Sequence, residues 1–149
     1  MNRYRNIFFL ALLALTESAL AACNISTLPI NFGNYDVFST VPLDSTTTLT
    51  VSCDQRVRVE MAISTSTHSG GFDPRQMKHL TGSDLLNYNL YTRANRSRIW
   101  GDGSGNTRTL RRRVRPNRPW NATVYGRITA TQDISVGQYN DSLVVTVIF

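Results

Sequence analysis

Apolar and polar residues alternate along several short stretches of the chain. Alternation with a period of two is typical of a β-strand that buries one face and exposes the other. The clearest case is residues 56–64, where valine, methionine and isoleucine alternate with arginine, glutamate and alanine. We expect further strands at residues 24–33, 45–53, 85–92 and 121–130.

These stretches predict the class of the fold. No window after residue 22 has helical periodicity, and turn-forming residues recur about every ten positions. Short strands separated by turns at this spacing are typical of an antiparallel β-sandwich with Greek-key connections. The pattern therefore predicts an all-β domain of roughly six or seven strands around one hydrophobic core.

The most strand-like stretch is residues 143–149, which is apolar on both faces apart from Thr146. A β-branched run of this kind is typical of a central strand with a neighbour on each side. Residues just upstream can form one neighbour, but the sequence ends at Phe149 with no turn and no returning strand. We therefore expect a sheet that is one strand short, whose open edge accepts a strand from another chain.

Residues 1–22 have the layout of a secretory signal peptide. A basic start precedes nine apolar residues, 7–15, and then a stretch rich in small residues, 18–22. Nine apolar residues are too few to cross a bilayer as a helix. We predict cleavage after Ala22, with Ala21 nearly as suitable, and a single domain over residues 23–149. The protein is then exported and is not a transmembrane protein.

Two cysteines, Cys23 and Cys53, remain after the predicted cleavage. In a secreted protein they favour a disulfide, which closes a loop of about 30 residues and contributes roughly 3–4 kcal/mol in the chain-entropy model. A second interpretation stays open. Residues 20–23 also resemble a bacterial lipobox, in which Cys23 carries a lipid and Cys53 is a free thiol.

Nine arginines and one acid, Asp102, give residues 93–118 a local charge of +8, and we expect a long loop there. Guanidinium groups match phosphate and carboxylate, so one interpretation is an anionic partner such as lipopolysaccharide, extracellular DNA or an acidic polysaccharide. The other is a solvated loop that aids solubility, and no nucleic-acid-binding motif accompanies the arginines. The candidate anion-binding residues are Arg108, Arg111, Arg112, Arg113, Arg115 and Arg118.

The sequence offers little that resembles catalytic chemistry. Neither His68 nor His79 has a ligand-type neighbour at metal spacing. The glycine-rich residues 101–106 do not lead from a strand into a helix, so they predict a surface turn and not a phosphate-binding loop. We therefore expect no catalytic residues, cofactor or metal.

Several short motifs recur in one order along the chain after Cys23. They are Phe32-Gly-Asn-Tyr35, Val51-Ser-Cys53, Phe72-Asp-Pro-Arg-Gln-Met77, Leu86-Asn-Tyr-Asn-Leu-Tyr91, Trp100-Gly-Asp-Gly103, Val124-Tyr-Gly-Arg-Ile128 and Gly137-Gln-Tyr-Asn-Asp141, the last leading into Val144-Val-Thr-Val147. Their order and spacing resemble those of the spore coat protein U domain family, which also supplies the subunits of archaic chaperone–usher pili in Gram-negative bacteria.

The resemblance implies an incomplete immunoglobulin-like sandwich that lacks its last strand. A periplasmic chaperone lends a strand to the groove, and at an outer-membrane usher the next pilus subunit replaces it. The cysteines stapled in the family correspond to Cys23 and Cys53. The walls of the donor-strand acceptor groove correspond to Ile25, Leu28, Ile30, Phe32, Leu143, Val145, Val147 and Phe149.

One departure from the family matters for position in a fibre. Polymerising pilins carry a donor segment ahead of the first cysteine, and here at most one residue separates the predicted cleavage site from Cys23. We therefore expect a non-enzymatic terminal or tip subunit of a surface fibre, serving adhesion or biofilm formation after transit through the periplasm. The alternative is a surface-anchored lipoprotein, or a stand-alone coat or matrix protein, that binds an anionic ligand through residues 108–118.

Overall fold

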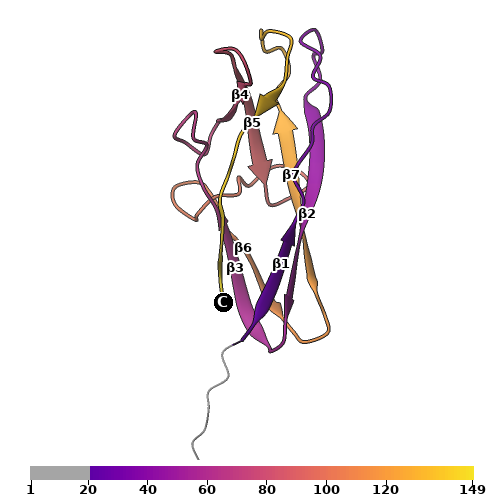
Figure 1. The fold of residues 1–149 in the computed structure, drawn as a ribbon, viewed down its shortest axis with the longest axis vertical. Helices are drawn as coiled ribbons and strands as arrows, with labels where there is room; N and C mark the ends of the chain where they lie inside the picture. Colours follow the sequence, from indigo (N-terminus) through magenta and orange to yellow (C-terminus); the bar gives the residue numbers. More distant parts are fainter. Residues whose placement is uncertain (1–20) are drawn as a thin grey trace, which may run out of the picture.

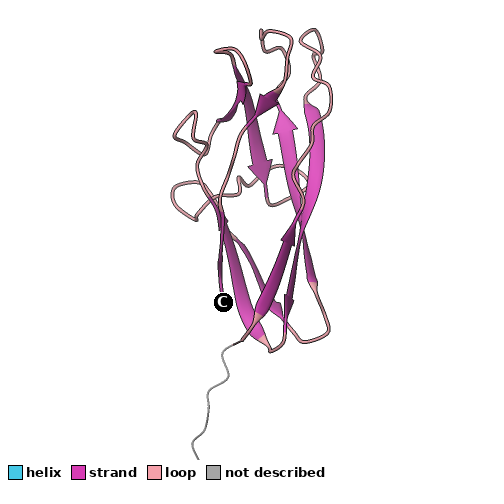
Figure 2. Ribbon diagram, viewed as in Figure 1, coloured by secondary structure: helices cyan, strands magenta, loops and turns pink. Residues whose placement is uncertain are grey.

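The computed structural model describes residues 21–149, which form β-strands and loops without a helix (Figures 1 and 2). The strands are β1 (Cys23–Thr27), β2 (Leu43–Cys53), β3 (Val57–Ile63), β4 (Arg75–His79), β5 (Leu85–Tyr91), β6 (Leu110–Val114), β7 (Trp120–Ile128), β8 (Tyr139–Asn140) and β9 (Val145–Ile148). In this part of the chain there is consequently no helix that could span a membrane. The predicted signal peptide, except for its last two residues, lies outside the described range.

The strands form two sheets in which every pairing is antiparallel. One sheet has the order β1-β2-β7-β5-β4-β8, and the other has the order β6-β3-β9. Figure 1 shows that β2 and β7 run along much of the molecule, whereas β3, β6 and β9 lie in its lower half. The predicted all-β fold of two antiparallel sheets is confirmed.

The core lies between the sheets and is built from the alternating residues of the long strands. Val51, Val59, Met61 and Val124 have no exposed surface, and they come from β2, β3 and β7. Trp100 is 2% exposed, and its indole N–H donates to the Met61 carbonyl oxygen at 3.0 Å. A large aromatic side chain is therefore buried with its polar atom satisfied.

Arg75 on β4 is also fully buried, and it joins three segments that are distant in sequence. Its guanidinium donates to Asn89 Oδ1 at 2.8 Å, to the Ser64 carbonyl oxygen at 3.1 Å and to the Trp100 carbonyl oxygen at 2.7 Å. The group also lies 5.2 Å from the centre of the Phe72 ring. Burial lowers the pKa of Arg75, and the hydrogen bonds offset part of the cost of removing the charge from water.

Several sequence predictions differ from the structure in detail. The strand expected at residues 24–33 is regular only as far as Thr27, and residues 28–36 continue without a ladder. No strand was predicted at β4, and the long loop expected across residues 93–118 contains β6 and most of the turn that leads from β6 to β7. The structure thus has more strands than the predicted six or seven.

Candidate functional site

The free edge of β9 is the first feature of the candidate site. β9 pairs with β3, and within residues 21–149 no strand pairs with its other edge. Val144, Ile148 and Phe149 are 67%, 60% and 52% exposed, while Val145 and Val147 are half-buried against the core. A strand with apolar side chains on both faces is therefore left at the border of its sheet.

β9 is held firmly in place on its paired side. The Ser64 N–H donates to the Val144 carbonyl oxygen at 2.9 Å, and the Val144 N–H donates to Ser64 Oγ at 3.1 Å. Just before β9, the Tyr88 hydroxyl donates to Asp141 Oδ2 at 2.8 Å, and burial together with this bond raises the pKa of Tyr88. The open edge is therefore presented by a fixed strand.

The opposite edge of the same sheet has different chemistry. This edge is β6, whose sequence is Leu-Arg-Arg-Arg-Val, and all three arginines are exposed. Charged side chains on an edge strand oppose pairing with another chain, whereas an apolar edge favours it. The two edges of this sheet thus differ in whether they allow a further strand.

β1 lies at the border of the six-stranded sheet, on the same side of the molecule as β9 (Figure 1). The segment after β1 folds over the core at Gly126. A Cβ atom there would lie 2.5 Å from Ile30 Cδ1 and 2.6 Å from Phe32 Cζ, so a glycine is needed for the close approach. These two side chains therefore cover the part of the six-stranded sheet that the shorter sheet leaves open.

A cleft of about 910 Å³ lies between residues 29–38 and 134–140. These segments follow β1 and precede β9 in the chain, so the cleft continues the gap between those two strands toward the upper end. Ile30, Phe32, Met77, Leu86 and Ile128 contribute apolar walls. The cleft therefore gives access to side chains of the core.

The structure places most of the residues predicted for the groove along this line. Six of them are half-buried and pack against the core: Ile25, Ile30, Phe32, Leu143, Val145 and Val147. Leu28 and Phe149 are 68% and 52% exposed and do not pack against it. Met77 and Leu86 were not predicted as lining residues, because contact across the cleft depends on how the strands are ordered.

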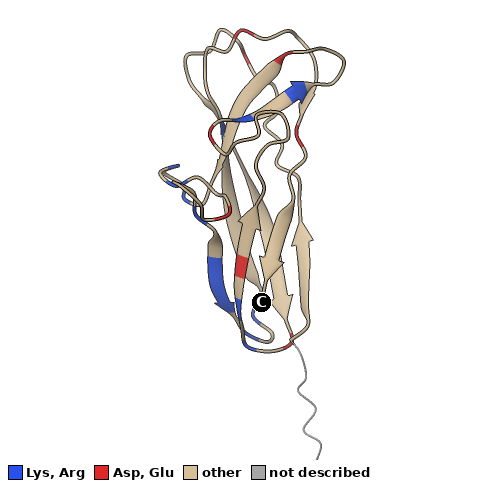
Figure 3. Ribbon diagram, turned by 90° about the vertical axis from the view of Figure 1, so that its left-hand side faces the viewer, with Lys and Arg blue, Asp and Glu red and all other residues tan. Residues whose placement is uncertain are grey.

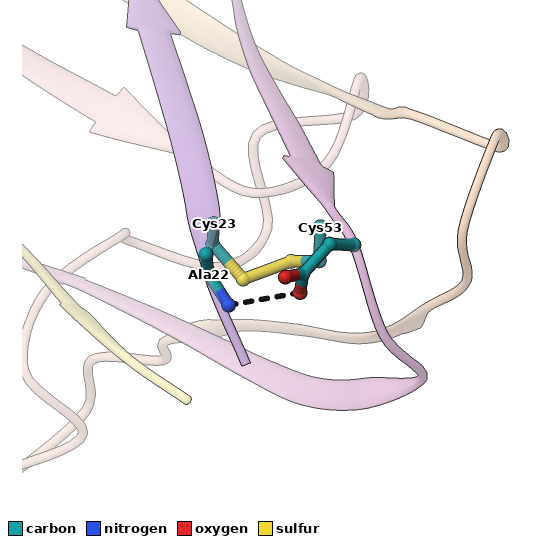
Figure 4. The surroundings of a disulfide bond; sticks show 4 residues. Ala22, Cys23 and Cys53 are labelled. Carbon is teal, nitrogen blue, oxygen red and sulfur yellow. Dashed lines mark hydrogen bonds between the residues drawn. A yellow bond between two sulfur atoms is a disulfide. The ribbon is translucent and has the colours of Figure 1, made fainter. Parts of the chain in front are cut away.

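The predicted disulfide between Cys23 and Cys53 is confirmed (Figure 4). It joins residues that are direct partners at the ends of β1 and β2. Beyond it, the Ala22 N–H donates to Asp54 Oδ1 at 2.8 Å, and the Asp54 N–H donates to the Ala22 carbonyl oxygen at 3.1 Å. Because a lipid thioether needs the same sulfur of Cys23, the bridge favours the disulfide interpretation over the lipobox.

The predicted arginine loop needs a correction. Arg111, Arg112 and Arg113 lie on β6, because Leu110 and Val114 pack inward at its two ends and pair with β3 (Figure 3). Arg111 forms a 2.7 Å ion pair with Glu60, and this bond lowers the pKa of the Glu60 carboxyl. Arg108 donates to the Thr107 carbonyl oxygen, so the six predicted residues do not form one uniform patch.

Comparison with known proteins identifies the family. The sequence matches the Spore Coat Protein U domain over residues 9–146, which is most of the chain. The chain belongs to this family. Protein U of Myxococcus xanthus is 28% identical over 130 residues, which cover 80% of this chain and 71% of that protein.

A solved structure from an archaic pilus resembles this spore coat protein U domain in fold. A chain in the chaperone–tip adhesion subunit pre-assembly complex of the archaic chaperone–usher Csu pili of Acinetobacter baumannii superposes with a TM-score of 0.60 and 21% identity. The match covers 87% of this chain and 40% of that chain, so the present domain spans less than half of its length. The minor tip subunit of the E. coli Hda pilus has a TM-score of 0.44, 12% identity and coverage of 83% and 79%.

The spore coat protein U domain also exposes apolar side chains at the end opposite the disulfide. Figure 1 shows three loops there, at residues 28–42, 80–84 and 129–138. Phe38 is 89% exposed, Val41 68%, Leu80 61% and Val136 fully exposed. We call this surface the loop end.

Proposed function

We propose that the protein is a structural, non-enzymatic subunit of a surface fibre built by the chaperone–usher route, and that it is completed by a strand from another chain. The observation that carries the proposal is the contrast between the two edges of the short sheet. β6 is charged, whereas β9 is apolar and unpaired on one side among the described residues. An added strand beside β9 pairs with its backbone and covers the apolar residues behind it.

The family and the fold support this proposal. The matched structure from Csu pili contains a subunit bound to its chaperone before assembly. By analogy, a periplasmic chaperone occupies the edge of β9 first, and an outer-membrane usher then exchanges it for a neighbouring subunit. Export and a final position at the cell surface follow from this route.

We further propose that the subunit sits at the fibre tip and serves adhesion through the loop end. The loop end faces away from the disulfide, and it exposes four large apolar side chains, Phe38, Val41, Leu80 and Val136, among polar residues. Large apolar side chains that are exposed together at one end of a domain are typical of an interaction surface. The matched pilus chain comes from a complex with a tip adhesion subunit, which agrees with this position.

A peptide experiment tests the strand addition. A synthetic peptide with alternating apolar residues should stabilise the purified mature domain, because it binds the folded state and not the unfolded one. At a hundredfold excess over its Kd the gain is about 2.7 kcal/mol, or several degrees in Tm. A peptide with serine at the apolar positions is the control for unspecific binding.

A matched pair of variants locates the binding edge. Leu143→Ser with Val147→Ser removes half-buried side chains beside the gap, and it should abolish the shift that the peptide produces in each variant's own Tm. Val144→Ser with Ile148→Ser changes exposed positions of the same strand and should preserve the shift. If no alternating peptide shifts the Tm of the parent domain, the proposal fails.

A further inference from the structure

The turn that leads from β6 in one sheet to β7 in the other holds two arginines opposite each other, although like charges repel. The turn has Pro116 and Asn117 at the two central positions, and Asn117 adopts a φ of 57°. The Arg118 N–H donates to the Arg115 carbonyl oxygen at 3.2 Å, and the two residues are direct partners across the turn. The backbone thus fixes two guanidinium-bearing residues opposite each other.

A second pair of like charges lies next to this turn, in the ladder between β3 and β6. Arg113 on β6 is the direct partner of Arg58 on β3. Like charges directly opposite each other in an antiparallel pair are destabilising. Two such pairs close together in the chain therefore oppose folding unless something neutralises them.

The acidic side chains supply that neutralisation only in part. Glu60 pairs with Arg111 and also attracts Arg58, and Asp44 pairs with Arg96 and Arg127. Across residues 21–149, no salt bridge involves the four other arginines of β6 and the turn after it. These are Arg112, Arg113, Arg115 and Arg118.

The same four residues line a hollow of about 290 Å³ together with Val114, Pro119 and Trp120. We call this feature the arginine pocket. Trp120 is 7% exposed and Val114 2%, so the pocket has a rigid apolar base beneath exposed arginines. The connection between β6 and β7, which carries Arg115 and Arg118, lies at the lower end of the molecule in Figure 1, where β1 begins with the disulfide, and away from the loop end.

We propose that the arginine pocket binds phosphate groups. Guanidinium groups donate in pairs to the oxygens of a phosphate, and several of them around one hollow can meet a multiply charged oxyanion from more than one side. Two other roles for these arginines are protection of the β6 edge and solubility. Charge anywhere along the strand would serve either role, and neither requires arginines that face one another around a hollow. This proposal is independent of strand addition at β9.

The binding test uses inorganic tripolyphosphate and isothermal titration calorimetry on the full mature domain. Arg115→Ser with Arg118→Ser should weaken binding at least tenfold. Arg93→Ser with Arg98→Ser removes the same charge from exposed positions outside the pocket, and it should change the affinity less than threefold. Arg115→Lys with Arg118→Lys keeps the charge but loses the paired donation of a guanidinium group. Its affinity for tripolyphosphate should lie between those of the two serine pairs.

A stability test separates the pocket from general attraction. Without ligand at low salt, Arg118→Ser should raise Tm by about 1–2 °C, since it relieves a like-charge pair. With saturating tripolyphosphate the parent domain should have the higher Tm, because it binds the ligand more tightly than Arg118→Ser does. Equal losses of affinity in both serine pairs, or a lower Tm of Arg118→Ser without ligand, would overturn the proposal.

Vesicles identify the source of the phosphate. Phosphatidylcholine vesicles with phosphatidic acid present phosphate on a membrane, and vesicles of phosphatidylcholine alone are the control. Binding to the acidic vesicles that is lost in Arg115→Ser with Arg118→Ser extends the site to lipid headgroups. Binding to tripolyphosphate without binding to vesicles assigns it to soluble or polymeric phosphate, and binding to neither probe refutes the site.

Discussion

Arg75 shows how a single side chain can connect segments that the strand ladders leave apart. Its acceptors come from three places. The Ser64 carbonyl oxygen lies just after β3, Asn89 Oδ1 is on β5, and the Trp100 carbonyl oxygen is in the segment between β5 and β6. The side chain is fully buried. Its removal therefore leaves buried polar groups without partners.

We expect Arg75→Ala to lower the free energy of unfolding by about 3–5 kcal/mol, the usual cost of breaking a buried charged network from one side. Arg75→Lys should recover part of this loss, since one ammonium group cannot reach all three acceptors. Urea unfolding measures both, with exposed Arg93→Ala as the control. A loss below about 1 kcal/mol for Arg75→Ala would show that the network is dispensable.

Asp44 provides a pH-dependent contribution at the surface. Arg127 donates to Asp44 Oδ1 at 2.7 Å and to Oδ2 at 2.9 Å, and Arg96 lies 3.0 Å from Oδ2. The hydrogen bond from Arg127 is the main reason that the pKa of Asp44 is lowered in the folded protein. The carboxylate therefore stabilises the fold at pH values above the ordinary aspartate pKa of about 4. This contribution is lost as the pH falls through the lowered pKa that Asp44 has in the folded protein.

The expected effect is small because the side chains are partly exposed. Asp44→Asn should cost about 0.5–1 kcal/mol at pH 7. The difference from the parent protein should shrink toward zero as the pH falls through the lowered pKa of Asp44, because the parent carboxyl then takes up a proton in the folded state as well. Unfolding in urea at pH 7, 5 and 2.5 checks this, and a difference that persists unchanged at pH 2.5 contradicts it.

At the scale of elements, the strands that could be predicted are those with regular alternation. β2, β3, β5 and β7 place an apolar residue inward at almost every second position, so their faces follow from the sequence. β4 escaped prediction because its inward position holds Arg75, whose burial depends on acceptors from three other segments. β6 escaped because a charged edge strand has no alternation to detect.

The candidate site was predictable for a similar reason and with a similar limit. The apolar character of residues 143–149 indicated an unfinished sheet, and the structure places β9 at an edge with one paired neighbour. All four arginines of the arginine pocket were among the six predicted anion-binding residues, but their grouping around one hollow without Arg108 and Arg111 could not be predicted. The grouping depends on the pairing of β6 with β3 and on the turn that sets Arg115 opposite Arg118, and neither follows from composition.

β1 is an element that depends on its disulfide. It has five residues, lies at the border of its sheet and pairs with β2 among the described strands. Cys23→Ala with Cys53→Ala should lower the free energy of unfolding by roughly 3–4 kcal/mol, because the link closes a loop of 30 residues in the unfolded chain.

Hydrogen exchange locates the loss of stability along the chain. In the cysteine-free variant the amides of β1 should exchange faster, because β1 can open locally without unfolding of the whole domain. The amides of β7, which has a paired strand on each side, should exchange only when the whole domain unfolds. Chemical denaturation gives the total change. If β1 stays as protected as β7 in the variant, the ladder with β2 suffices to hold it.

For the whole molecule, the two ends have separate chemistry. The disulfide, the arginine pocket and the end of β9 gather at one end, and the exposed apolar residues of the loop end lie at the other. An adhesive subunit that is joined to its fibre through β9 needs its contact surface remote from that junction. The proposed adhesion and the proposed strand addition should therefore be separable by mutation.

Phe38→Ser with Val136→Ser tests this separation. Both side chains are almost fully exposed, so the free energy of unfolding should change by less than about 0.5 kcal/mol. Adsorption to a methylated silica surface, followed by quartz-crystal microbalance, should fall several-fold because the apolar contact area at the loop end is removed. Phe38 and Val136 also line the cleft, so the donor peptide is tested on Val41→Ser, which changes an exposed loop-end residue outside the cleft and should leave the peptide response unchanged. The control is Val144→Ser with Ile148→Ser, which removes comparable exposed apolar side chains outside the loop end. An equal loss of adsorption in that control would show that adsorption does not depend on the loop end.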